Sequence, residues 1–351
     1  MSLAAAQWVE RNWLLRRILR RQLAALYRSR DAASDRARYE SLKARDFVPD
    51  AVLVQISRAC NLKCSMCGWA VWARNRGFMK MDLYRRILSE MKLNGIRRLN
   101  LTNPQGEPLL SPHAIECIEL GIAEGFDVHI NTNCTTLGDR NIDGLVANAR
   151  SGRLSIQASF SGYDKRSHET VYVGSQFERS SAKLQKLNAA LAAENLQRYL
   201  TVNGIIMDRE ELPLHIGYLE RLGIDRKCVT MGLPDNFAGI VQVGRLHRVT
   251  GLFSFKHELA YRSLRLCNLL AYYVLIYDDG KVSACSCRDS EGVMEIGDIT
   301  TQSLAEIRNG ARFRAMMDAF MRRDLSQMPL CQKCDIPYGD RENEKLFHAD
   351  S

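Results

Sequence analysis

Long apolar runs are absent from this sequence. No stretch approaches the ~18–20 uninterrupted apolar residues of a membrane span, although 46% of the chain is hydrophobic. Arginines also interrupt the apolar residues between positions 14 and 21, so the N-terminus has no signal-peptide core. These two absences predict a cytoplasmic protein without a transmembrane segment.

Internal repeats, low-complexity segments and basic patches interleaved with aromatic residues are absent as well. Because such patches bind single-stranded nucleic acid, we expect no nucleic-acid partner. Much of the net charge of +9 comes from the first fifty residues. We expect a solvated basic surface there, with a phosphorylated substrate or an acidic partner surface as the alternative.

Cysteine, by contrast, is plentiful. Eleven cysteines would suit a disulfide framework in a short secreted chain, but here metal or redox chemistry is the better interpretation. The 351 residues suffice for an α/β barrel and a smaller appended domain.

Residues 1–49 form a basic N-terminal extension. An expected helix over 7–30 has leucines near one face and arginines on the others. We expect its apolar face to pack on the protein, with peripheral membrane contact as the alternative. Residues 31–48 are polar and charged and predict a linker or a short helix.

Residues 50–245 alternate between strand and helix patterns, which predicts a parallel sheet with right-handed crossovers. The expected strands are 52–57, 97–102, 127–132, 154–160, 199–207 and 227–233, with helices near 81–94, 112–124, 139–150, 178–195 and 211–222. Six units are fewer than the eight of a closed barrel. We therefore predict an α/β fold, a partial (β/α)6 TIM-like barrel with ligands at the C-terminal ends of its strands.

Three cysteines follow the first expected strand in a C-x3-C-x2-C loop: Cys60, Cys64 and Cys67. Thiolates suit zinc or iron–sulfur clusters. Zinc sites usually pair two C-x2-C knuckles, and no second knuckle lies nearby. Three close cysteines fit a four-iron cluster with one open iron better.

Residues 246–351 predict a small α+β module, with a hairpin over 272–284 and helices near 303–309 and 311–323. Its cysteines are Cys267, Cys285, Cys287, Cys331 and Cys334. Four thiolates from separate places can close one iron–sulfur site, and a zinc ribbon is the alternative.

The C-x3-C-x2-C loop after a first strand resembles the radical S-adenosylmethionine (radical SAM) superfamily. The resemblance implies a [4Fe-4S] cluster on Cys60, Cys64 and Cys67, with SAM chelating the open iron. One electron, from a donor such as flavodoxin or ferredoxin, would cleave SAM to methionine and a 5'-deoxyadenosyl radical. That radical would abstract hydrogen from the substrate.

Residues 104–108 resemble the family's GGEP motif, which holds the amino group of SAM. Gln105 replaces the first glycine, whereas Gly106 and Glu107 keep the pattern. Glu107 and nearby carbonyls offer the acceptors that an ammonium group needs.

Three further positions resemble cofactor contacts of the family. Met66 stands where an aromatic residue near adenine is usual, and its polarisable sulfur can cover a ring face. Ser159 matches the ribose-contacting serine, and Asn203 on the next strand is a weaker candidate. For Ser159 and Asn203, an ordinary hydrogen bond at a strand end is the alternative.

The C-x12-G-x4-C pattern from Cys267 to Cys285, with Cys331 and Cys334, resembles the SPASM module and its shorter twitch form. The resemblance implies one auxiliary [4Fe-4S] cluster on these four cysteines. Cys287 is then left over as an alternative ligand, a hydrogen-atom donor or a small buried residue. Cys117, Cys134 and Cys228 are interpreted as core or loop cysteines.

The resemblance implies oxidation of a small polar, sugar-like metabolite, with the auxiliary cluster accepting an electron. Radical epimerases, diol-dehydrating lyases and peptide-modifying SPASM enzymes are the alternatives within the family. A winged-helix domain that would grip a leader peptide is not indicated in residues 1–49. A non-catalytic metal-binding scaffold is the alternative outside the family.

Overall fold

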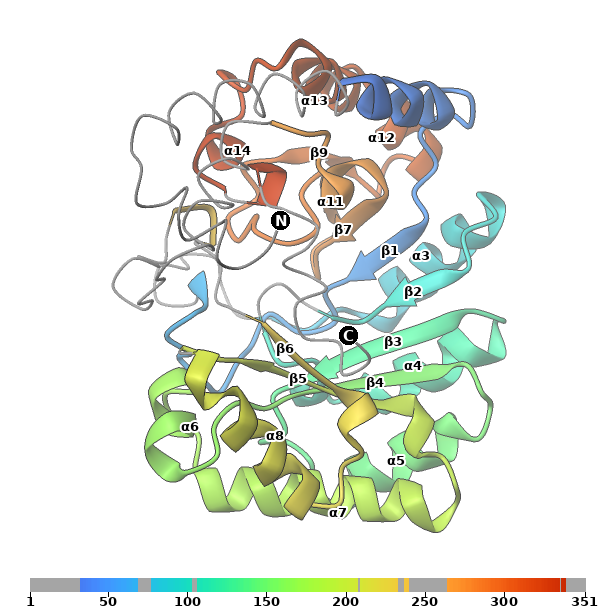
Figure 1. The fold of residues 1–351 in the computed structure, drawn as a ribbon. Coiled ribbons are helices and arrows are strands. Elements are labelled where there is room, and N and C mark those ends of the chain that lie inside the picture. Colours follow the sequence, from blue (N-terminus) through green and yellow to red (C-terminus); the bar gives the residue numbers. More distant parts are fainter. Residues whose placement is uncertain are drawn as a thin grey trace, which may run out of the picture.

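The computed structural model describes residues 32–68, 77–102, 106–207, 209–232, 237–239, 264–334 and 336–338 of the chain. Its centre is a nine-stranded sheet with the order β6-β5-β4-β3-β2-β1-β7-β8-β9 (Figure 1). The first six strands are β1 Ala51–Val54, β2 Arg98–Asn100, β3 Asp127–Thr132, β4 Leu154–Ser159, β5 Leu200–Ile205 and β6 Val229–Gly232. All six predicted strands are confirmed.

Neighbouring strands from β1 to β6 pair in parallel, because a helical crossover returns the chain to the same end of the sheet each time. The helices of this half are α3 Met81–Leu93, α4 Ala114–Ala123, α5 Asp139–Ala149, α6 Lys165–Val171, α7 Phe177–Ala193 and α8 Leu212–Arg221. Five of them were predicted within a few residues. Helix α6 was missed.

One face of this sheet packs on the helices. Val128 and Ile130 of β3 share a core with Ile118 of α4 and Leu145 of α5. Side chains alternate along a strand, so His129 points to the opposite face. Among the described strands β6 and β9 are edges and the sheet does not close, which agrees with the predicted partial barrel.

The C-terminal part extends the same sheet. The predicted hairpin is confirmed as β7 Tyr273–Ile276 and β8 Lys281–Ser283, followed by β9 Glu295–Asp298. Strand β7 pairs in parallel with β1, the strand that leads to Cys60. The helices here are α11 Asn268–Ala271, α12 Leu304–Asn309, α13 Ala311–Arg322 and α14 Pro329–Lys333.

Short 3-10 helices complete the described secondary structure, at Pro108–Leu110, Gln197–Tyr199, Arg209–Glu211, Arg226–Cys228, Phe237–Gly239 and Ile336–Tyr338. Residues 32–43 form the short helix that was one of two predictions for this region. The predicted helix over 7–30 lies outside the described residues. Within the described part of the chain, no helix is long and apolar enough to cross a membrane.

Arg308 of α12 holds the C-terminal part together. Its buried guanidinium donates hydrogen bonds to the carbonyl oxygens of Phe47, Leu270, Ala271 and Tyr273. It also lies 3.8 Å from the centroid of the Phe313 ring. Burial, the largest cause, and the nearby Arg45 together lower the pKa of Arg308 to about 9.

Candidate functional site

The three cysteines of the C-x3-C-x2-C motif lie in the loop that leaves β1, residues 58–68, which we call the cysteine loop. All three are half-buried. Burial raises the pKa of the Cys60 thiol to about 11 and raises that of Cys64 further, and neighbouring cysteines of the loop add to both shifts. The three thiols therefore share one electrostatic environment, in which binding to a cationic iron centre would compensate for the charge of the thiolates.

None of the eleven cysteines, all of which are described, forms a disulfide. No three cysteine, histidine or acidic side chains of the described residues are arranged to hold a single metal ion. A cluster makes a different demand, since each thiolate binds a separate iron atom. The donor set of the cysteine loop, three thiols spaced C-x3-C-x2-C, fits such a cluster.

Glu107 joins the cysteine loop to the loops that follow β2 and β3. Its backbone N–H donates to the carbonyl of Ala59 at 2.8 Å, immediately before Cys60. Its buried carboxylate accepts hydrogen bonds from Thr132 Oγ1, Thr136 Oγ1 and the backbone N–H groups of Leu109 and Asn133. Burial raises the pKa of Glu107, while these donors oppose the shift.

Three of these hydrogen bonds reach Oε1 and one reaches Oε2. Glu107 thus fixes the loops around the cysteine loop, and its contact with an ammonium group stays a prediction. Gly106 has φ +114°, a backbone conformation that suits glycine. Gln105 lies outside the described residues.

The segment after α6 holds the cysteine loop from another side. The backbone N–H groups of Lys63 and Ser65 donate to the carbonyls of Val173 and Val171, each at 2.9 Å. Between these carbonyls lies the buried Tyr172, which forms an apolar cluster with Leu62 and Val171, and Cys60, Cys64 and Met66 pack against this cluster. Helix α6 therefore supports the cysteine loop directly.

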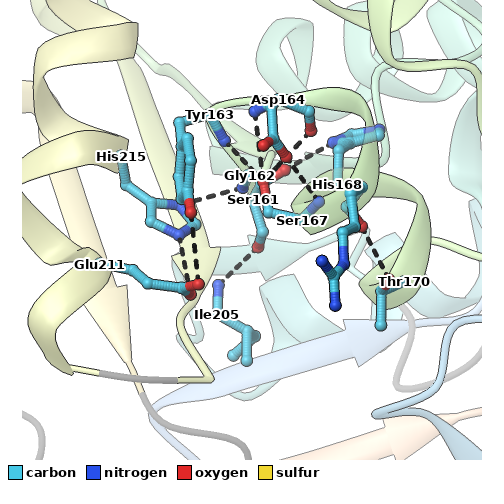
Figure 2. A network of polar contacts seen from close by, with 11 residues as sticks. Ser161, Gly162, Tyr163, Asp164, Ser167, His168, Thr170, Ile205, Glu211 and His215 are labelled. Carbon is cyan, nitrogen blue, oxygen red and sulfur yellow. Dashed lines mark hydrogen bonds and ion pairs between the residues drawn. The ribbon is translucent and has the colours of Figure 1, made fainter.

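Two buried histidines fix α6 and the loop after β4 (Figure 2). His168 Nδ1 lies 2.5 Å from the carbonyl oxygen of Ser161, and its Nε2 lies 2.9 Å from Ser175 Oγ. His215 Nδ1 accepts the backbone N–H of Gly162 at 3.0 Å. Burial lowers the pKa of both histidines, that of His215 to about 4.

The predicted cofactor contacts Met66, Ser159 and Asn203 come together at this end of the sheet. Met66 lies in the apolar patch with Tyr172 and Ile205. Ser159 and Asn203 are register partners at the ends of β4 and β5. Ser159 Oγ donates to Asn131 Oδ1 at 2.7 Å, a hydrogen bond between neighbouring strands, and the contact of Ser159 with a ribose stays a prediction.

Nine uncharged polar residues line the sheet face that points away from the helices, in three rows that cross neighbouring strands. We call them the polar rows. They are Asn100, His129 and Ser155; then Asn131, Gln157 and Thr201; then Ser159, Asn203 and Thr230. All nine are partly or fully exposed. Burial lowers the pKa of His129, which favours the neutral imidazole.

Two charged residues on this face, Arg98 and Asp127, lie closer to the N-terminal ends of the strands than the polar rows do. Arg98 and Asp127 are register partners at the N-terminal edge of the sheet. Each is already paired, Arg98 with Asp50 and Asp127 with Arg153. The polar rows therefore present hydrogen-bond donors and acceptors without net charge.

The C-terminal cysteines also gather in one place. Burial is the largest cause of the raised pKa of Cys331, and the Cys285 and Cys267 thiols raise it further. Burial raises the pKa of Cys285 to about 12. Cys267 caps the N-terminal end of α11, and Cys331 and Cys334 lie buried in and after α14. Three separate places in the fold thus supply the thiols: the start of α11, the segment after β8, and α14 with the residue that follows it.

Cys287 lies beside this set and has a partner of its own. Arg288 Nη1 lies 2.6 Å from Cys287 Sγ, and its guanidinium lies 4.6 Å from the centroid of the Phe237 ring. Cys117 and Cys134 are buried and Cys228 is half-buried beside β6, as expected of core or loop cysteines.

The sequence-based prediction missed the contributions of Tyr172, His168 and the residues after β3. A signal for α6 was present, because Asp164 and Ser167 form a capping box. The polar run over 131–136, at the C-terminal end of a strand, was a second signal. Nothing in the sequence pointed to Tyr172.

Known proteins resemble this chain both in its C-terminal part and over longer stretches of the sequence. Residues 267–335 match the SPASM family model, described as an iron-sulfur cluster-binding domain. A cofactor-modifying protein for a tungsten-containing aldehyde ferredoxin oxidoreductase from Pyrococcus furiosus is 24% identical over 242 residues, 66% of each chain. A PqqA peptide cyclase from Rhodopseudomonas palustris is 27% identical over 168 residues, 48% of this chain and 42% of the cyclase. These curated relatives are thus matched over two thirds of their length or less.

Solved structures share the fold. SuiB of Streptococcus suis bound to the precursor peptide SuiA has a TM-score of 0.61 at 16% identity, over 86% of this chain and 74% of SuiB. BtrN in complex with AdoMet and 2-DOIA has a TM-score of 0.57 at 15% identity, over 82% of this chain and 93% of BtrN. The chain therefore shares the fold of these solved structures, and its residues 267–335 match the SPASM iron-sulfur cluster-binding domain model.

Proposed function

We propose that this protein is a radical SAM enzyme that oxidises a small, uncharged, hydroxyl-rich metabolite at a C–H bond. The observation that carries the proposal is the set of polar rows on the sheet face opposite the helices. Hydroxyl and amide side chains recognise substrate hydroxyls by paired hydrogen bonds, and a site built in this way strongly rejects analogues that lack them. A charged substrate would instead call for an unpaired arginine, lysine or carboxylate.

In this proposal Cys60, Cys64 and Cys67 hold the first [4Fe-4S] cluster, and SAM binds at its open iron. When bound, the cluster and SAM supply a one-electron cleavage that yields a hydrogen-abstracting radical. The chain places Gly106 beside the cysteine loop through Glu107, and Met66 with Ile205 offers an apolar surface suited to adenine. Ser159 and Asn203 belong to the polar row at the C-terminal ends of the strands. Their hydroxyl and amide groups could bond to the ribose of SAM.

In this proposal the C-terminal SPASM domain accepts an electron from the substrate radical. Cys267, Cys285, Cys331 and Cys334 are the proposed ligands of one auxiliary [4Fe-4S] cluster, because the Cys267 and Cys285 thiols lie near enough to Cys331 to raise its pKa and Cys334 follows Cys331 at the end of α14. With all its irons bound by protein, that cluster has no position for SAM and serves as an electron acceptor. The first cluster needs an external donor such as flavodoxin or ferredoxin.

Anaerobic reconstitution tests the proposal. We expect about eight irons per chain, as two four-iron clusters require, and 5'-deoxyadenosine when SAM and dithionite are added. Metabolite profiling of a deletion strain should show accumulation of an uncharged polyol or sugar, and substrate deuterium should appear in deoxyadenosine. Zinc in place of iron, or no SAM cleavage, would contradict the proposal.

Peptide modification is the second candidate, favoured by the similarity to the PqqA peptide cyclases and to SuiB, which was solved with a precursor peptide. The same assays separate the two. A peptide-modifying enzyme should release deoxyadenosine in the presence of a peptide and leave metabolite pools of the deletion strain unchanged. Epimerisation would place solvent deuterium on the product carbon and require Cys287 as hydrogen donor.

A further inference from the structure

A closed ring of three side chains lies against Cys60. Asn61 Nδ2 donates to Thr135 Oγ1 at 2.7 Å, and Thr135 Oγ1 donates to Asn133 Oδ1 at 2.5 Å. Asn133 Nδ2 donates back to Asn61 Oδ1 at 3.1 Å, which closes the ring. The ring joins the cysteine loop to the loop after β3, two segments that are far apart in the sequence.

The ring settles the direction of the Asn133 side chain. Its Oδ1 already accepts from both the hydroxyl and the backbone N–H of Thr135, the latter at 3.0 Å. An acceptor held by two donors must be the oxygen, so the NH2 group points the other way. One of its hydrogens is used by Asn61, and the nitrogen lies 4.0 Å from Cys60 Sγ.

The backbone of Asn133 is also fixed by a hydrogen bond. Its backbone N–H donates to the buried Glu107 carboxylate at 2.8 Å. Cys60 Sγ also receives hydrogen bonds from the backbone N–H groups of Asn61 and Leu62, which oppose the increase in its pKa caused by burial. Several donors therefore converge on this one sulfur, and Asn133 is the donor supplied by a different segment of the chain.

We propose that Asn133 is a positioning residue that donates a hydrogen bond to the Cys60 sulfur and thereby raises the reduction potential of the first cluster. The inference rests on the proposed function, because it takes Cys60 as a cluster ligand. Hydrogen bonds to cluster sulfurs stabilise the more negative, reduced form and are one of the means by which proteins set the potential. The ring formed with Asn61 and Thr135 keeps the donor aimed at the sulfur.

The test is a redox titration of the reconstituted full chain, followed by the electron paramagnetic resonance signal that changes when SAM is added. That signal belongs to the first cluster and not to the auxiliary one. Asn133→Leu should shift the midpoint to more negative potential, changing the ratio of reduced to oxidised cluster about tenfold at fixed potential, or 59 mV for one electron. Thr135→Val keeps the amide but opens the ring, and should give a smaller shift of the same sign.

Asn141→Leu is the matched control. Asn141 donates to the Thr136 carbonyl at the end of the same loop, and its removal should leave the midpoint unchanged. An unshifted midpoint in Asn133→Leu with full iron content would overturn the inference. Should that variant lose its iron, an unshifted Thr135→Val would do the same. A wild-type protein without a SAM-responsive signal would instead contradict the proposed function.

Discussion

The two cysteine sites of this protein are built in opposite ways. The first takes three thiols from one short loop, Cys60 to Cys67, and that loop has little regular structure of its own. The second takes its thiols from residues spread between 267 and 334 and rests on a hairpin and several helices. Thiols that are close in sequence still need other segments to hold them, whereas distant thiols rely on the fold to bring them together.

The anchors differ as well. The cysteine loop is held mainly by groups of the barrel, Glu107, Tyr172 and the ring around Asn133, and the ion pair of Arg58 with Asp278 ties it to the C-terminal part. The C-terminal site is held by two buried arginine contacts: Arg308 bonds to backbone carbonyls, and the buried Asp35 pairs with Arg323 at 2.7 Å. This contrast predicts different responses to mutation and to acid.

The largest expected effect comes from removing one thiol at each site. Cys64→Ala and Cys331→Ser should each lower the iron content from about eight to about four per chain, because each deletes a proposed ligand of one four-iron cluster. Only Cys64→Ala should abolish formation of 5'-deoxyadenosine from SAM; Cys331→Ser should retain it and lose product oxidation.

Cys117→Ala is the control for this pair, since Cys117 is buried in α4 beside Met81 and away from both sites. It should keep about eight irons. Loss of SAM cleavage in Cys331→Ser at full occupancy of the first site would show that the two sites are not functionally separate.

Arg308→Met should give the next largest effect. It would leave the carbonyls of Phe47, Leu270 and Ala271 buried without their donor. At ~1–3 kcal/mol for each of these three orphaned groups, we expect a loss of roughly 3–9 kcal/mol in the free energy of unfolding. Because Leu270 and Ala271 belong to the helix that Cys267 caps, auxiliary iron should be lost before the iron of the cysteine loop.

Chemical denaturation and iron content measure this change. Arg312→Met, which removes an exposed arginine bonded to one carbonyl, serves as the comparison and should cost less than about 1 kcal/mol. Equal losses of iron from both sites in Arg308→Met would contradict the separate anchoring.

The smallest expected effect is a pH dependence of the free energy of unfolding, which arises from His215 in α8. The folded pKa of His215, about 4, lies below its ordinary value of 6.5, because burial disfavours the imidazolium. The Gly162 N–H also occupies Nδ1, the atom that would have to be protonated. The unfolded chain thus binds more protons between these two values, so stability present above pH 6.5 should fall as pH decreases towards 4.

A difference of this size corresponds to about 3 kcal/mol over that range. His215→Gln should flatten the dependence, measured as the free energy of unfolding in denaturant from pH 7 to pH 4. His113→Gln, at a half-exposed surface position, should leave the slope intact. A slope unchanged in His215→Gln would show that His215 does not carry it.

Much of the fold followed from local patterns. Strand and helix periods placed all six barrel strands and five of their helices, since each element must bury one face. Helix α6 escaped because its seven residues, Lys165–Val171, carry too few apolar positions to show a period. Strand β9 escaped because four residues, Glu295–Asp298, include glycine and two acidic residues.

The sequence alone determined the chemistry on offer: three clustered thiols, a Gly-Glu-Pro turn and a second, scattered cysteine set, all recognisable because spacing along the chain is a local property. Only the tertiary structure decided what supports them. In the folded chain, Glu107 is buried and its hydrogen bonds join the cysteine loop to the loops after β2 and β3. Tyr172 packs against the cysteine loop, and nine polar residues form rows across the sheet. Such relations depend on strand register and on contacts between segments far apart in the sequence, as between Ser65 and Val171, and no local pattern encodes them.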